Sequence, residues 1–282
     1  MTIPSTTGPV DGERPVRVGA QLQPQHAEYA DIRRAVAEAE EIGVDVVFTW
    51  DHFFPLYGDP DGKHFECWTI LGAWAEATEH VEIGALVTCN SYRNPDLLAD
   101  MARTVDHISG GRLILGIGAG WCERDYASYG YEFGTPGRRL DALGEALPRI
   151  KKRFHALNPA PTREIPVLVG GGGERKTLRH TATYADIWHG FGNVETITHK
   201  HQVLDTWCRD VGRNPREIER SAKINNGDLD FAPGLYAAGT RLFTMSATGP
   251  AYDLGELREL VAWRDAVNRG QIRSTEPPGP VR

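Results

Sequence analysis

Asp51 and His52 are the neighbouring residues whose types best suit acid-base chemistry. They follow a short run rich in β-branched residues, Val44 to Thr49, so they stand where a buried strand would end. Imidazole titrates near neutrality without help from its surroundings, which makes His52 the candidate general acid or base. Asp51 would orient a polar ring system or cap the following turn. From position alone, the alternative is a histidine that caps the strand or bonds to backbone.

The spacing of potential ligands predicts no metal site. The chain contains no H-E-x-x-H pattern and no His-His-carboxylate spacing. His199 and His201 fall two positions apart in an expected helix, where the two rings do not face one site. The four cysteines, Cys67, Cys89, Cys122 and Cys208, show no C-x-x-C spacing, so they indicate neither zinc nor a disulfide framework.

Four consecutive glycines, Gly170 to Gly173, follow an expected strand and precede an expected helix. The free backbone N–H groups and the helix dipole at such a junction favour an anion, and a phosphate is the expected one. Arg175 and Lys176 add positive charge nearby. The run is not a P-loop, because no Gly-Lys-Ser/Thr follows it. A tight structural turn is the alternative interpretation.

The stretch from Asp106 to Trp121, DHISGGRLILGIGAGW, combines a polar turn, a short apolar run and spaced glycines. Its apolar run, Leu113 to Ile117, is too short for an ordinary helix and reads as a strand buried on both faces. Gly118 and Gly120 remove side chains where backbone turns sharply or approaches a flat, large group. The sequence therefore predicts a strand end that holds a ligand.

Aromatic residues gather after several expected strands. Trp50, Trp121 and Trp188 each stand at a strand end, where an aromatic ring either walls a pocket or packs against the core. The segment from Trp121 to Arg139 has aromatic residues without clean periodicity and is predicted to be a loop or short helices near a pocket. We assign Trp50, Trp121 and Tyr126 to a substrate pocket, although packing is the simpler interpretation of each tryptophan alone.

The elements that must position these groups alternate between short β-branched runs and amphipathic stretches. This alternation is typical of βα units around a parallel sheet. Eight strands over roughly 250 residues predict a (β/α)8 TIM barrel, with an open doubly wound sheet as the alternative. The expected strands are Val16 to Gln23, Val44 to Thr49, Val81 to Thr88, Leu113 to Ile117, Ile165 to Val169, Asp186 to His189, Ile218 to Ile224 and Thr240 to Met245.

Helices are expected between these strands. Apolar periodicity and capping residues place them over 28–42, 67–78, 95–108, 140–154 and 254–267, with another opening at 174–176. The interval from Asn225 to Gly239 is short for a full helix with two loops. It predicts a trimmed connection on that side of the barrel.

Length and composition favour one large domain. The chain has 282 residues with 40% apolar content, and we expect the domain over 15–270, a flexible leader over 1–14 and a flexible tail over 271–282. A net charge of -7 argues against a nucleic-acid or anionic-membrane partner. No segment approaches the roughly 18 apolar residues of a membrane span. Cysteines without a disulfide pattern fit a cytoplasmic location.

Four motifs together resemble the bacterial-luciferase-like superfamily. They are Trp50-Asp51-His52, Tyr92 to Pro95, Ser109 to Trp121 and Val169 to Gly173. Within the superfamily the chain, over about Val16 to Val267, is similar to the deazaflavin-dependent oxidoreductases that use coenzyme F-420. The resemblance implies a luciferase-like TIM barrel, usually a homodimer, with the deazaflavin ring in the barrel mouth.

The resemblance also implies roles for individual residues. Asp51 would contact the ring side of the cofactor, and His52 would stand near the hydride-bearing carbon. A non-proline cis peptide that backs the ring falls at Ala85-Leu86 by alignment on Asn94-Pro95. The other implied cofactor contacts are Thr88 facing the ring, backbone under the cofactor at Gly118 and Gly120, and phosphate binding by Gly171, Gly172, Gly173, Gly192 and Asn193.

The implied activity is hydride transfer between coenzyme F-420 and a small organic substrate, with His52 as proton donor or acceptor. Relatives that use FMN more often carry Glu-His-His after strand two, so Asp51-His52 favours the deazaflavin. An FMN-dependent monooxygenase and a cofactor-binding protein without catalysis are the alternatives. Trp121 stands where sugar-phosphate dehydrogenases of the family have a glutamate, which favours a fairly apolar substrate.

Overall fold

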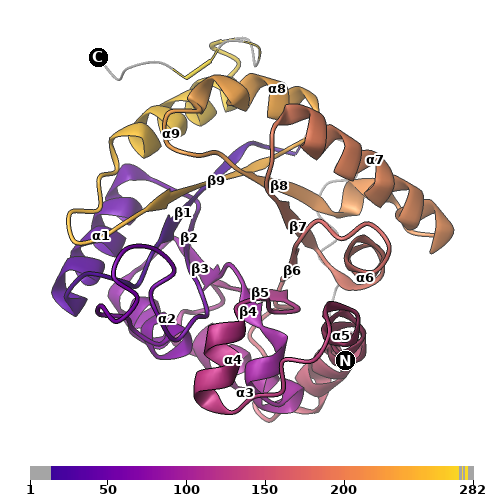
Figure 1. Ribbon diagram of the computed structural model, residues 1–282. Coiled ribbons are helices and arrows are strands. Elements are labelled where there is room, and N and C mark those ends of the chain that lie inside the picture. The colour runs from indigo at the N-terminus through magenta and orange to yellow at the C-terminus, as the bar shows by residue number, and fades with distance from the viewer. Residues whose placement is uncertain (1–13, 273–274, 276, 279–282) are drawn as a thin grey trace.

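A closed barrel of parallel strands, surrounded by helices, forms the core of the molecule (Figure 1). The computed structural model describes residues 14–272, 275 and 277–278. The leader expected over 1–14 falls outside these residues except for Arg14, and so do seven of the twelve residues of the tail expected over 271–282. The strands are β1 (Arg17–Leu22), β2 (Val46–Thr49), β3 (Glu82–Ala85), β4 (Thr88–Cys89), β5 (Leu113–Gly118), β6 (Val167–Gly170), β7 (Ile187–Gly190), β8 (Glu219–Lys223) and β9 (Leu242–Ala247).

The strand order is that of a TIM barrel. Neighbouring strands run β3-β2-β1-β9-β8-β7-β6-β5-β4, and a parallel pairing of β3 with β5 closes the ring. Strands β3 and β4 share one of the eight barrel positions, because the chain leaves the ladder after Ala85 and rejoins β5 at Thr88. The (β/α)8 prediction is therefore confirmed, with each expected strand within two residues of its place except the third, which is split.

Local signals explain most of the helix boundaries. Asn94 caps α3 by accepting from the backbone N–H of Asp96, and Pro95 occupies the first turn, where its missing N–H costs nothing. Gly43 ends α1 in the left-handed conformation. The helices of eight residues or more are α1 (Tyr29–Ile42), α2 (Cys67–Ala77), α3 (Pro95–Ile108), α5 (Pro136–Ala156), α6 (Thr177–Tyr184), α7 (Val194–Asp210) and α9 (Gly255–Asn268).

Two connections shape the barrel mouth. The segment after β5 holds a short helix, α4 (Glu123–Tyr129), as the prediction of short helices allows. Helix α5 begins at Pro136, four residues before the expected Leu140, since Thr135 caps it and proline opens it. After β8 the short interval holds only a 3-10 turn (Leu229–Phe231) and the six-residue α8 (Ala232–Ala237), which confirms the trimmed connection.

The core has two layers. Most buried apolar side chains lie between the strands and the surrounding helices. A second, smaller cluster fills the barrel interior with Val46, Phe48, Leu86, Ile114, Leu168, Ile187 and Leu242. Side chains alternate in and out along a strand, and β2 accordingly contributes two alternate residues, Val46 and Phe48, to this inner cluster. Among the described residues, no helix is long and apolar enough to cross a bilayer.

Two histidines, His189 and His201, are buried in this framework and His64 is half-buried, and all three rings stay neutral there. Burial lowers the pKa of His189 to about 3, and it lowers the pKa of His64 and His201 to about 4. The ring of His189 bonds to the hydroxyl of Ser221 at 2.9 Å across the β7-β8 pair. Protonating any of these rings would place a charge in a poorly solvated site.

These histidines predict that the protein loses stability in mild acid. A histidine in the unfolded chain has a pKa near 6.5, so below that pH the unfolded state binds more protons than the folded state. We expect the free energy of unfolding to fall as the pH drops from about 6.5 to 4.5, measured by urea titration at each pH. His189→Gln should flatten this slope, whereas His80→Gln, a change at an exposed ring, should leave it unchanged. Equal stability at pH 7 and pH 5 would contradict the prediction.

Candidate active site

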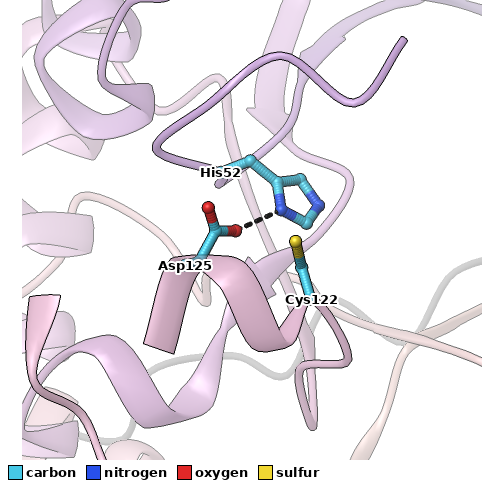
Figure 2. A group of neighbouring side chains, drawn as sticks. All are labelled: His52, Cys122 and Asp125. Carbon is cyan, nitrogen blue, oxygen red and sulfur yellow. Dashed lines mark hydrogen bonds and ion pairs between the residues drawn. The ribbon is translucent and has the colours of Figure 1, made fainter. Parts of the chain in front are cut away.

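His52 lies at the carboxyl end of β2 and is held by Asp125 of α4 (Figure 2). Its Nδ1 atom stands 2.6 Å from Oδ2 of Asp125. A carboxylate only accepts hydrogen bonds, so the hydrogen sits on Nδ1, and Nε2 is the nitrogen that remains for proton transfer. The imidazole side chain is 12% exposed. The contact with Asp125 fixes the orientation of the ring, and the acid-base role of His52 stays a prediction.

Asp125 is a buried carboxylate that is fully engaged. Besides His52, it accepts from the hydroxyl of Tyr92 at 2.9 Å and from the backbone N–H of Phe53. Burial alone would raise the pKa of Asp125, but the hydrogen bonds from His52 and Tyr92 outweigh it and hold the pKa below its usual value. Asp125 therefore stays ionised and stabilises positive charge on His52. The sequence places Asp125 among the polar residues that follow strand ends, here after β5, but it assigns this carboxylate no role.

The Asp51 side chain is buried and bonded within the protein, so it is not exposed at the barrel mouth. It is 1% exposed, and its two oxygens accept from the guanidinium of Arg93 at 2.6 and 3.1 Å. One oxygen also accepts from the backbone N–H of Cys89. Burial opposes the charge on Arg93, but its bonds to Asp51 raise its pKa overall. These partners make Asp51 a positioning residue within the protein, and its contact with a cofactor ring stays a prediction.

The three residues assigned to the substrate pocket differ in exposure. Trp121 is 65% exposed and meets the edge of the His52 ring at a centroid distance of 5.6 Å, so it faces the mouth. Trp50 is 6% exposed and donates from its indole N–H to Nε2 of His64 at 3.1 Å. Tyr126 is fully buried, with its hydroxyl 3.2 Å from Sγ of Cys89. The assignment of Tyr126 to the pocket wall was wrong, because its ring packs behind the site.

The gap between β3 and β4 carries the non-proline cis peptide, which joins Leu86 to Val87. The expected position, Ala85-Leu86, was wrong by one residue, because β3 continues its ladder through Ala85 and the chain departs only afterwards. Leu86 belongs to the inner barrel cluster, and Val87 packs against it. The Leu86 carbonyl accepts from the side-chain amide of Gln21 on β1 at 2.9 Å. Leu86 and Val87 thus form an apolar floor under the mouth.

Two glycines of β5 leave the space that this floor and its neighbouring backbone occupy. A Cβ atom added at Gly116 would meet the carbonyl oxygen of Ala85 at 1.9 Å, and one added at Gly118 would meet a methyl of Val87 at 2.8 Å. At Gly120, which has a positive φ of 81°, the Tyr126 hydroxyl would stand 2.1 Å away. Protein atoms occupy the space beside both glycines, and the positive φ of Gly120 fits the expected sharp turn. The expectation that backbone at Gly118 and Gly120 lies under a cofactor stays a prediction.

Thr88 is also turned away from the mouth. It is fully buried, and its hydroxyl accepts from the indole N–H of Trp68 on α2 at 3.1 Å. The side chain therefore points to the helix layer, and the expectation that it faces a ring in the mouth was wrong. Thr88 lies on β4, where it pairs with Ile117 of β5. Side chains alternate along a strand, so Thr88 points to the helix layer and the side chain of Cys89 points the other way.

The glycine run after β6 presents Gly171, Gly172 and Gly173 as exposed or half-buried backbone before α6. The nearest cation is Lys200 of α7, whose Cε would lie 3.5 Å from a Cβ at Gly172. Lys200 pairs with Glu174 at 2.6 Å, and His199 bonds to the same carboxylate oxygen. Of the two cations expected here, Lys176 instead pairs with Asp141 at 2.6 Å, and Arg175 is exposed.

Gly192 and Asn193 lie beside this run at the start of α7. Asn193 caps the helix by accepting from the backbone N–H of Thr196 at 2.9 Å. A Cβ at Gly192 would stand 2.8 Å from Cγ2 of Thr196. The structure brings both residues to the same end of the barrel as Gly171 to Gly173, because β6 and β7 are neighbours. The phosphate role of these five residues stays a prediction.

The opposite side of the mouth is polar and was not foreseen. A cavity of about 340 Å³ there is lined by Gln23, Lys223, Asn225, Asn226, Ser246, Ala247, Thr248 and Asp253. Lys223 ends β8, and burial lowers its pKa. No carboxylate among the described residues forms an ion pair with it. The hydroxyl of Thr248 donates to Oε1 of Gln23, which leaves the Gln23 amide N–H groups as donors. A lone lysine at the end of a short strand gives little signal in sequence.

Taken with the fold, these features define a (β/α)8 barrel with an oriented histidine at its carboxyl end. The chain belongs to the luciferase-like monooxygenase family, whose sequence model matches residues 14–225. A putative coenzyme F-420-dependent oxidoreductase of Mycobacterium tuberculosis is 32% identical over 212 residues, which cover 75% of this chain and 52% of that protein. The F-420-dependent glucose-6-phosphate dehydrogenase of Amycolatopsis mediterranei is 28% identical over 177 residues, which cover 56% and 52%. The chain spans about half the length of these relatives.

Solved structures share the fold. An F-420-dependent secondary alcohol dehydrogenase in complex with an F-420-acetone adduct superposes with a TM-score of 0.75 at 18% identity, covering 93% of this chain and 99% of that one. The F-420-dependent tetrahydromethanopterin reductase of Methanopyrus kandleri gives 0.71 at 16% identity, covering 88% and 97%. A long-chain alkane monooxygenase gives 0.71 at 14% identity, covering 92% and 93%. At these identities the likeness establishes the fold alone.

The packing of the apolar floor predicts that Gly116 tolerates no side chain. Gly116→Ala would push a methyl group into the Ala85 carbonyl, which is backbone and cannot swing aside. We expect a loss of about 1 to 3 kcal/mol in the free energy of unfolding, typical of overpacking. Gly72→Ala is the matched control, since Gly72 lies inside α2 with nothing within 4 Å, and alanine there should stabilise by about 0.5 to 1 kcal/mol. Denaturant titration of both variants decides, and equal effects would refute this account of Gly116.

Proposed function

We propose that this chain is a coenzyme F-420-dependent oxidoreductase that moves a hydride between the cofactor and an organic substrate. The observation that carries the proposal is the His52–Asp125 pair at the barrel mouth, 2.6 Å between Nδ1 and Oδ2. The family assignment and relatives whose names specify coenzyme F-420 support the choice of cofactor. The cofactor supplies a two-electron hydride carrier that needs no oxygen, so dehydrogenation or reduction is the reaction class.

The mouth offers surfaces that fit a flat ring with a phosphate-bearing tail. Leu86 and Val87 supply an apolar floor against which a ring would lie. The exposed or half-buried backbone of Gly171 to Gly173, with Gly192 and Asn193 on the next strand connection, would hold the phosphate. The Gly171 N–H already donates to the His189 carbonyl, so the free donors lie beyond it. Lys200 would supply positive charge there, provided that an anion competes with Glu174 for its ammonium group. The proposed fit of the cofactor therefore rests on two features. The apolar floor matches the shape of a flat ring, and backbone donors with one cation, Lys200, match a phosphate-bearing tail.

His52 performs the proton step in this mechanism. Its Nδ1–H donates to Asp125, which fixes the ring plane and leaves Nε2 to give or take the proton that accompanies hydride transfer. When Nε2 holds that proton the ring is positively charged, and the ionised Asp125 stabilises it. Tyr92 keeps its proton, since burial raises its pKa, and it anchors Asp125 from the far side. Asp51 acts indirectly by holding Arg93 and the chain after β2 in place.

The substrate is proposed to combine an apolar part with at least one hydrogen-bond acceptor. Trp121 offers an exposed ring next to His52, which favours the fairly apolar substrate expected from sequence. Lys223 and Gln23 offer donors in the polar cavity on the other side of the mouth. A substrate reaching both would place its reacting carbon between them. We also propose a homodimer, as the family resemblance implies.

Cofactor choice is tested by binding. We expect the purified chain to bind oxidised coenzyme F-420 at least about tenfold more tightly than FMN, as measured by quenching of the cofactors' fluorescence. An FMN-dependent monooxygenase is the second candidate, because a long-chain alkane monooxygenase shares the fold. Tight FMN binding with negligible F-420 binding would favour that candidate and reject ours.

The role of His52 is tested by turnover. His52→Ala should keep the affinity for coenzyme F-420 and lower turnover by roughly 100-fold or more, the usual cost of losing a general acid or base. Substrates come from a panel of enones, imines, quinones and secondary alcohols followed by the cofactor's visible absorbance. His80→Ala, at a ring beyond the opposite end of β3, is the control and should keep full activity. Unchanged turnover in His52→Ala would remove His52 from the mechanism and favour a binding protein without catalysis.

A further inference from the structure

His52, Cys122 and Asp125 combine three kinds of metal ligand in one small space (Figure 2). The imidazole nitrogen, the thiol sulfur and the carboxylate oxygen all lie within 4.8 Å of one another. Around a tetrahedral Zn²⁺, with bonds of about 2.0 to 2.3 Å, neighbouring ligand atoms stand roughly 3.3 to 3.8 Å apart. The three side chains therefore need shifts of only about 1 Å to meet one ion.

We propose that these three side chains bind a thiophilic divalent cation of the Zn²⁺ class at the barrel mouth. Thiolate and imidazole are the ligands that Zn²⁺ prefers over Mg²⁺ or Ca²⁺, and the carboxylate supplies negative charge. Three protein ligands leave the fourth tetrahedral position open to water. Binding of the cation is independent of the proposed oxidoreductase function.

The local backbone brings the ligands together. Cys122 immediately precedes α4, and its carbonyl accepts from the backbone N–H of Asp125, which places the two side chains on one side of the first helical turn. His52 reaches them from the loop after β2, and Figure 2 shows the thiol and the carboxylate both directed toward its ring. Of the cysteines, Cys122 alone is partly exposed within the described part of the chain. An ion from solvent can therefore reach this thiol.

The proton balance of binding follows from the ligand set. Cys122 releases its thiol proton to solvent, and the cation replaces the hydrogen between His52 and Asp125. The imidazole keeps one hydrogen, now on Nε2, and binds the cation through Nδ1. Asp125 binds the cation through Oδ2, which keeps its hydrogen bond from Tyr92, and Oδ1 keeps its hydrogen bond from the Phe53 N–H.

An occupied site would withdraw His52 from acid-base chemistry. With Nδ1 bound to the cation and a hydrogen on Nε2, the ring has no lone pair left to accept a proton. The cation is therefore a reversible inhibitor of any reaction that uses His52 as a base. This consequence, unlike the binding itself, rests on the proposed function.

The test uses Co²⁺ as an optical substitute for Zn²⁺, titrated into the full chain without an added histidine tag. Thiolate bound to Co²⁺ gives a charge-transfer band in the near ultraviolet, which a site made of surface histidines or carboxylates does not. We expect a band that saturates at one Co²⁺ per chain and disappears when Zn²⁺ is added. It should be lost in Cys122→Ser and retained in Cys208→Ser, a change at a buried cysteine of α7.

Further variants separate a site from a single reactive thiol. In His52→Ala and in Asp125→Asn the affinity for Co²⁺ should fall by roughly tenfold or more, with folding checked by circular dichroism. Zn²⁺ should raise the melting temperature of the native chain, because a ligand that binds the folded state stabilises it. The melting temperature of Cys122→Ser should stay unchanged, because this variant lacks the thiolate that binds the cation. Absence of the band in the native chain, or its persistence in Cys122→Ser, would overturn the proposal whether or not coenzyme F-420 binds.

Discussion

The carboxylate of Asp125 is the point on which the barrel mouth depends. It is buried, and it accepts from His52 and Phe53 after β2, from Tyr92 after β4, and it belongs to α4 after β5. Removing one partner of a buried charged group costs about 1 to 3 kcal/mol or more, because the remaining group stays desolvated. The carboxylate thus joins the loops of three successive barrel positions. It also sets the tautomer of His52, so structural and chemical roles share one group.

A second buried ion pair supports the same region. Arg93 holds Asp51 through two hydrogen bonds and reaches Glu66, which caps α2 through the backbone N–H groups of Trp68 and Thr69. The adjacent residues Asp51 and His52 therefore point to different partners, one to Arg93 and one to Asp125. Successive residues of an extended chain project to opposite sides, which is why one of them is structural and the other faces the mouth.

The mouth itself has two chemically different halves. On the side of β3, β5 and β6 the glycines admit Val87 and create an apolar floor. On the side of β1, β8 and β9 the inward positions are polar, and Ser246 donates to Gln21 while Thr248 donates to Gln23. Lys223 adds the charge on this polar side. Under the proposed function a cofactor ring would rest on the apolar floor, and Trp121 lies beside His52.

The sequence by itself determined the barrel and indicated the residue that we propose for acid-base chemistry. Strand periodicity and helix caps are local, so they located seven of the eight barrel strands to within two residues and placed His52 at a strand end. Only the tertiary structure revealed Asp125 as its partner, 73 residues away in the chain, and the isolated Lys223. It also turned Tyr126 and Thr88 away from the mouth and moved the cis peptide to Leu86-Val87. These features depend on which side chains meet when the barrel closes, and strand register across the ring, not local sequence, decides that.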